Sequence, residues 1–127
     1  MKVNELMVSD LVYNHRNWIC SIVEIHKDSA VIIAKHYGEE EFKLDDLRPI
    51  SLTPGILEKI GFETQPNIGY IIDDWDGTQI IYDSWNHNLR IIKNYKVCLD
   101  IETFDDIAVH ELQHALKLCG IEREIKL

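Results

Sequence analysis

One short stretch near the end of the chain carries residue types that could do chemistry together. His110 and His114 lie four residues apart, with Glu111 directly after the first histidine, which fits the H-E-x-x-H signature of zinc peptidases. On a helix, histidines at this spacing project from the same side and can share a zinc ion, while the glutamate serves as general base. The motif therefore predicts, as one alternative, a zinc-dependent hydrolase or peptidase with Glu111 as its catalytic residue.

The rest of such a zinc site is not evident in the sequence. A catalytic zinc needs a third protein ligand and a walled cleft. The extended zincin pattern fails because Lys117 and Gly120 stand where glycine and histidine belong, and nothing marks the upstream His87 as a ligand. A chain of this composition contains the motif by chance about 0.02 times, so accidental matches are common across many chains. We therefore expect no catalytic residue, metal or cofactor, and keep the zinc site as the alternative.

The segment that carries the motif is expected to form a helix over about residues 104–119. Thr103 and Asp106 have the spacing of a capping box, and Gly120 is a typical helix stop. On a helical wheel both histidines fall on the polar face, which predicts that they point to solvent, whereas Glu111 falls on the apolar side. That apolar face is predicted to hold Phe104, Ile107, Ala108, Val109, Leu112, Ala115, Leu116, Leu118 and Cys119.

The N-terminal part of the chain is predicted to form four short strands. Their segments are rich in β-branched and aromatic residues, and turn residues separate them at close spacing. The segments are 10–14, 18–26, 30–37 and 41–44. This pattern favours a small curled sheet, an SH3-like β-barrel lobe over residues 1–52.

A short linker helix is expected over residues 53–62. Thr53 can cap it, Pro54 suits the first helical position, and Gly61 fits a left-handed stop. Residues 63–127 then read as a β-meander of three or four strands packed against the C-terminal helix, with Asp76-Gly77 as a two-residue hairpin signal. The whole chain is therefore assigned to the α+β class.

Composition narrows the functional classes. The 127 residues carry a net charge of −9, with 22 acidic against 13 basic residues and no cluster of lysine and arginine. We therefore expect no nucleic-acid partner, because such binding needs a basic face, and expect a protein partner instead. There is no apolar run long enough for a membrane span and no signal-peptide pattern, so the prediction is a cytoplasmic protein with its three cysteines reduced. The sequence does not indicate an oligomeric state.

Three aromatic residues flank the predicted hairpin and form a candidate binding patch: Trp75, Tyr82 and Trp85. Exposed aromatic side chains near a turn often anchor a protein partner. The alternative is that they pack against a neighbouring strand, which is the commoner fate of aromatic residues in a sheet.

Three segments of the chain resemble a family of small uncharacterised proteins from anaerobic gut bacteria and their phages or mobile elements. The segments are MKVNELMVSDLVY, RPISLTPGILEKIGF and VHELQHALKLCGIEREIKL. In the family pattern glutamine often stands at the position of Glu111 and asparagine at that of His114, while Ser9 and Gly55 replace a glycine and a glutamate. The resemblance implies a mobile-element origin and an accessory or interaction role, and it brings no activity that could be assigned to this chain. The resulting prediction is a non-catalytic protein-binding or adaptor module.

Overall fold

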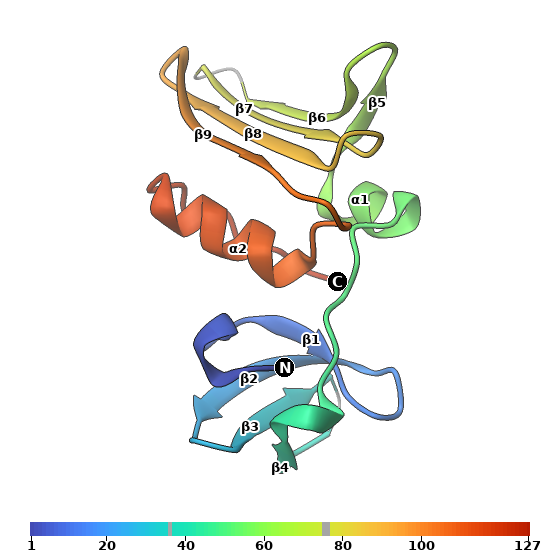
Figure 1. Cartoon of the computed structure of the whole chain (residues 1–127), viewed down its shortest axis with the longest axis vertical. Helices are drawn as coiled ribbons and strands as arrows, with labels where there is room; N and C mark the ends of the chain where they lie inside the picture. Colours follow the sequence, from blue (N-terminus) through green and yellow to red (C-terminus); the bar gives the residue numbers. More distant parts are fainter. Residues whose placement is uncertain (36, 75–76) are drawn as a thin grey trace. The chain divides into compact units, whose positions relative to one another are not determined.

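The structure is a computed structural model that describes residues 1–35, 37–74 and 77–127. Within these ranges the chain forms two antiparallel sheets and two α-helices, so the predicted α+β class is confirmed (Figure 1). No helix in the same ranges is long and apolar enough to cross a membrane.

The chain divides into two compact units. The first comprises residues 1–50 together with 108–110, and the second comprises residues 51–107 together with 111–127. The predicted linker helix thus belongs to the second unit, and the helix that carries the histidine motif has its first residues in the first unit.

The first unit contains a four-stranded antiparallel sheet with its strands in sequence order. The strands are β1 (Leu11–Tyr13), β2 (Ile19–Ile25), β3 (Ser29–Ala34) and β4 (Glu39–Lys43). They lie within or close to the four predicted segments. Because β1 and β4 are the outer strands and pair only with β2 and β3, the described strands do not close into a barrel.

One face of this sheet buries its alternating apolar residues. Val12 pairs with Cys20, Ile22 pairs with Ile32, and all four are at most 2% exposed. Residues of two 3-10 turns, η1 (Val3–Glu5) and η2 (Leu44–Asp46), and the chain next to them complete the core with Leu6, Leu44 and Leu47. The period of two expected for a half-buried strand explains this arrangement.

Helix α1 (Pro54–Ile60) forms as the sequence predicts. The Oγ1 of Thr53 accepts a hydrogen bond from the Ile56 backbone N–H at 3.4 Å, which caps the first turn. Gly61 ends the helix in a left-handed conformation with φ of 113°, and the N–H of Phe62 donates back to Leu57 at 3.0 Å.

The second unit contains a five-stranded antiparallel sheet with its strands in sequence order. The strands are β5 (Glu63–Gln65), β6 (Gly69–Asp74), β7 (Thr78–Asp83), β8 (Asn88–Lys93) and β9 (Lys96–Glu102). The sequence predicted three or four strands. The discrepancy is explained by β5, which has three exposed polar residues and no apolar alternation to reveal it.

The predicted two-residue hairpin at Asp76-Gly77 falls partly outside the described residues and stays a prediction. The described part of the β6–β7 ladder extends to the pair of Asp74 with Thr78. Trp75 and Asp76 lie outside the described residues, while Gly77 has a φ of 88°. Strands β8 and β9 are joined by Asn94 and Tyr95, both with positive φ, which is the backbone of a type I′ turn.

Helix α2 (Val109–Leu118) begins five residues later than predicted. Thr103 does not cap it, because its hydroxyl donates to the Asp105 carbonyl at 2.6 Å. The backbone just before the helix is already bonded elsewhere: Ile107 accepts from Leu52 at 3.1 Å, and Val109 donates to Ile50 at 2.7 Å. A segment held in this way cannot also supply the first turn of a helix.

The late start of α2 also changes its apolar face. Phe104 is fully exposed and Leu118 is 78% exposed, so these two predictions are wrong. The other seven predicted apolar residues are buried, namely Ile107, Ala108, Val109, Leu112, Ala115, Leu116 and Cys119.

Candidate functional site

The three residues of the histidine motif differ in accessibility. His110 is buried with 6% of its surface exposed, His114 is half-buried, and Glu111 is exposed. The helical wheel predicted an exposed His110 and a Glu111 on the apolar side, and the structure corrects both. Because the helix begins only at Val109, His110 lies in its first turn, directly after the buried residues Ala108 and Val109.

The motif does not gain a third ligand in the described part of the chain. No group of three or more His, Cys, Asp or Glu side chains there is arranged to hold a metal ion. The Nδ1 of His87 lies 3.2 Å from a carboxylate oxygen of Asp106, within ion-pair distance, although the two atoms are not aligned as a hydrogen bond. The zinc alternative, with His110 and His114 as ligands, therefore stays a prediction.

The three aromatic residues of the predicted binding patch differ in their exposure to solvent. Tyr82 is 1% exposed and belongs to the core, where burial raises the pKa of its phenol and the backbone of Ile107 hydrogen-bonds it. Tyr82 cannot contact a partner, so that part of the predicted patch is wrong. Trp75 lies outside the described residues. Trp85 is 91% exposed and is the aromatic residue of the three that the structure places at the surface.

The turn that carries Trp85 is fixed by a single carboxylate. One oxygen of Asp83 accepts from the backbone N–H groups of Trp85 at 3.0 Å and Asn86 at 3.4 Å. Its other oxygen accepts from the side-chain amide of Asn86 at 2.8 Å. These bonds, above all the one from the Asn86 side chain, lower the pKa of Asp83. The backbone under Trp85 is therefore ordered although the ring itself is in solvent.

Beside this turn lies a groove of about 530 Å³. The turn between β5 and β6 forms its other wall, and Figure 1 shows both turns at the same end of the sheet. The groove is lined by Thr64, Gln65, Asn67, Ile68, Gly69, Tyr70, Asp83, Ser84, Trp85 and Asn86. Ile68 is 41% exposed, so it adds a second apolar surface next to Trp85.

Gly69 allows the two walls to approach each other. Its φ is 109°, and a Cβ added there would lie 2.6 Å from the carbonyl oxygen of Tyr82, closer than any side chain tolerates. The sequence did not indicate this wall, because the three exposed residues of β5 show no strand pattern and the turn after them carries no motif.

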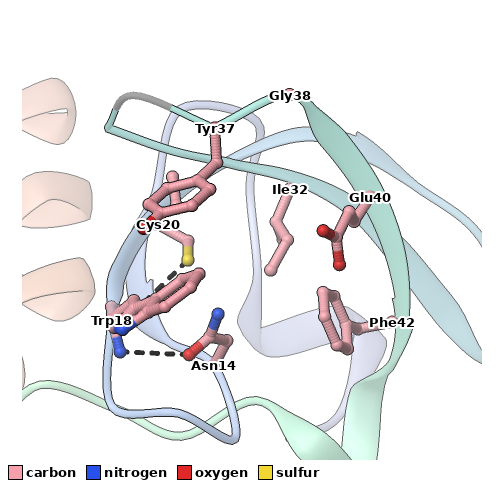
Figure 2. Close-up of a pocket in the computed structure, with 9 residues that line it drawn as sticks. Asn14, Trp18, Cys20, Ile32, Tyr37, Gly38, Glu40 and Phe42 are labelled. Atoms are coloured by element: carbon pink, nitrogen blue, oxygen red, sulfur yellow. Dashed lines mark hydrogen bonds between the residues drawn. The ribbon is translucent and has the colours of Figure 1, made fainter.

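The first unit has a smaller cavity, which Figure 2 shows between Trp18 and Tyr37 on one side and Phe42 and Glu40 on the other. The rings of Trp18 and Tyr37 stack at 4.4 Å, and the Oδ1 of Asn14 accepts from the backbone N–H of Trp18 at 3.0 Å. With a volume of about 10 Å³ the cavity has room for a single water molecule. The cavity is therefore too small for a larger ligand, and the residues around it pack against the ring of Trp18.

Comparison with known proteins identified no relative of this chain. No family model matches the chain, and neither a curated protein nor a solved structure matches it. The resemblance to the mobile-element family therefore stays a prediction, and a functional proposal must rest on the geometry of the chain itself.

Proposed function

We propose that this protein is a non-catalytic binding module that docks a partner protein in the groove beside Trp85. The observation that carries the proposal is the combination of an indole ring that is 91% exposed and a backbone that Asp83 holds in place. Tryptophan is enriched among the residues that dominate protein–protein binding energies. A ring on an ordered turn binds with less loss of conformational entropy than the same ring on a mobile one.

The energetics require more than the tryptophan alone. Burying about 200 Å² of indole contributes roughly 5 kcal/mol at 25 cal/mol per Å². Association costs at least about 4 kcal/mol in lost translational and rotational freedom, so the ring by itself gives only weak binding. Ile68, which is 41% exposed in the same groove, supplies the further apolar area that a specific complex needs.

We also propose that the N-terminal sheet is an SH3-like module, which its four short antiparallel strands in sequence order support. As the resemblance implies, the protein would serve as an adaptor of a phage or mobile element. In that setting the partner is a protein of the host cell or of the element.

A quantitative capture experiment tests the docking function. The full chain is immobilised, incubated with an extract of the organism that encodes it, and the retained proteins are quantified by mass spectrometry. The Trp85→Ala variant is compared with Phe104→Ala, a matched control in which another fully exposed aromatic ring outside the groove is removed. We expect a protein that the wild type and Phe104→Ala retain and Trp85→Ala loses. If no retained protein depends on Trp85, the proposal is wrong.

A further inference from the structure

We propose that the occupant of the groove is a basic peptide segment of the partner, with a lysine or arginine side chain lying across the ring of Trp85. The inference rests on the proposed function and adds the chemistry of the partner to it.

The charge of the surrounding chain supports a cationic occupant. Residues 62–89, which comprise β5, β6, β7 and the turns between them, contain no lysine or arginine. The same stretch carries the carboxylates of Glu63, Asp73, Asp74, Asp76 and Asp83. Asp83 is the charged residue in the lining of the groove itself. Asp73 and Asp74 end β6 at the opposite end of the sheet, so at the groove it is Asp83 that would attract a basic segment and repel an acidic one.

Two arginine side chains of the second unit are already paired with carboxylates. Arg123 lies 3.6 Å from Asp74, and Arg90 lies 3.3 Å from Asp100. His87 follows the turn in the chain and lies against Asp106. Asp83 is the charged residue that lines the groove, and its negative charge is not paired with a cation in any ion pair of the described residues.

The face of Trp85 is suited to a cation, and no arginine or lysine of the described residues lies over it. Elsewhere in the protein, Arg16 lies over the ring of Trp18 at 4.9 Å, and Arg48 lies over the ring of Tyr13 at 5.9 Å. Trp85 is 91% exposed, so its ring is not covered in this way. A lysine or arginine of the partner would make the cation–π contact that the other two rings make within the chain.

The inference is tested with three short peptides of equal length. One alternates glycine with arginine and lysine, one carries glutamine at the basic positions, and one carries glutamate. Each is titrated into the ¹⁵N-labelled full chain at low salt, and the indole N–H signal of Trp85, assigned by its loss in Trp85→Ala, reports binding. The variants Trp85→Ala and Asp83→Asn are followed through their backbone amide signals in the groove. The control is Glu102→Gln, which removes one negative charge from β9, outside the groove.

We expect saturable shifts of groove residues with the basic peptide and at least about tenfold weaker binding of the glutamine and glutamate peptides. Trp85→Ala should weaken the basic peptide by about tenfold and Asp83→Asn by about threefold, while Glu102→Gln leaves it unchanged. Equal binding of the basic and glutamine peptides, preference for the glutamate peptide, shifts spread over the whole acidic surface, or no binding would each overturn the inference. The capture experiment can still find a partner that depends on Trp85 when the basic peptide does not bind. Failure of the peptide test is therefore distinct from failure of the docking function.

Discussion

Replacing Gly69 by alanine should destabilise the second unit far more than an ordinary glycine substitution. Gly69 begins β6 and lines the groove beside Trp85. Its φ of 109° is a conformation that residues with a side chain rarely adopt. A Cβ at this position would lie 2.6 Å from the carbonyl oxygen of Tyr82 and 3.3 Å from the Cα of Asp83. Both contacts are with backbone atoms, which cannot move aside as the end of a side chain can.

The expected cost has two parts. Holding alanine in a left-handed conformation costs about 1–2 kcal/mol. Relieving the contact with the Tyr82 oxygen requires β6 and β7 to separate by about 0.5 Å where their hydrogen-bonded ladder begins, at a cost comparable to overpacking a core, about 1–3 kcal/mol. The free energy of unfolding should therefore fall by roughly 2–5 kcal/mol, a large share of the 5–15 kcal/mol typical of a domain.

Gly55 supplies the matched control for this experiment. It lies in the first turn of α1, within the same unit, and a Cβ added there would meet nothing within 4 Å. Gly55→Ala should be neutral or stabilise by up to about 1 kcal/mol, because alanine favours helix. Urea denaturation followed by circular dichroism measures both variants. If Gly69→Ala unfolds within about 1 kcal/mol of the wild type, the contact derived from the backbone is wrong.

Three further outcomes follow from the site residues. Zinc content after dialysis, measured by elemental analysis, should be equally low in the parent and in His114→Asn; one zinc per chain in the parent that the variant loses would establish the zinc alternative. Hydrogen bonds from Asn86 hold the pKa of Asp83 below 3.8, so its contribution to stability is full above that pH and is lost as the pH falls through the folded pKa. Urea denaturation from about pH 5 to pH 2 should therefore show a smaller loss of stability for Asp83→Asn than for the wild type. Burial raises the pKa of Cys119 to about 11 while Cys98 is exposed, so a thiol reagent at about pH 8 should modify Cys98 first, and Cys98→Ser should remove the fast phase.

The elements that local chemistry specifies were predictable from the sequence. Helix α1 is bounded by Thr53 at its start and Gly61 at its end, and both act within one turn of chain. The strands of the first sheet show alternating apolar residues that all face one core. These signals do not depend on any distant residue, which is why the predicted and observed boundaries agree closely.

The start of α2 could not be predicted from local chemistry. Thr103 and Asp106 have the spacing of a cap, yet the backbone of Ile107 is bonded to Leu52, which is 55 residues earlier in the chain (107 − 52 = 55). A long-range backbone pairing of this kind leaves no mark on the sequence around it. The wheel also misplaced His110, because burial depends on what packs against a residue and not only on its angle on the helix.

The two tryptophans that the structure describes show why a binding residue is harder to predict than a fold. Both stand just after a side chain that caps a tight turn: Asn14 accepts from the backbone N–H of Trp18, and Asp83 accepts from that of Trp85. Local sequence thus orders both turns in the same way. The difference lies in what covers each ring. Tyr37 stacks on Trp18 at 4.4 Å.

The rings that cover a tryptophan come from chain segments that its own neighbours in sequence do not specify. Trp18 receives Tyr37 from the chain beyond β3, together with the guanidinium of Arg16 at 4.9 Å. Trp85 remains 91% exposed, in a groove whose lining carries the carboxylate of Asp83 and no lysine or arginine. No lysine or arginine of the described residues covers this indole, and Asp83 holds its turn in place, so the ring is complementary to a cation that another chain brings. An arginine introduced into the groove should therefore compete with the basic side chain of the partner. Ser84 lines the groove beside Trp85, so Ser84→Arg is expected to weaken binding of the basic peptide, whereas Ser84→Gln should leave it unchanged.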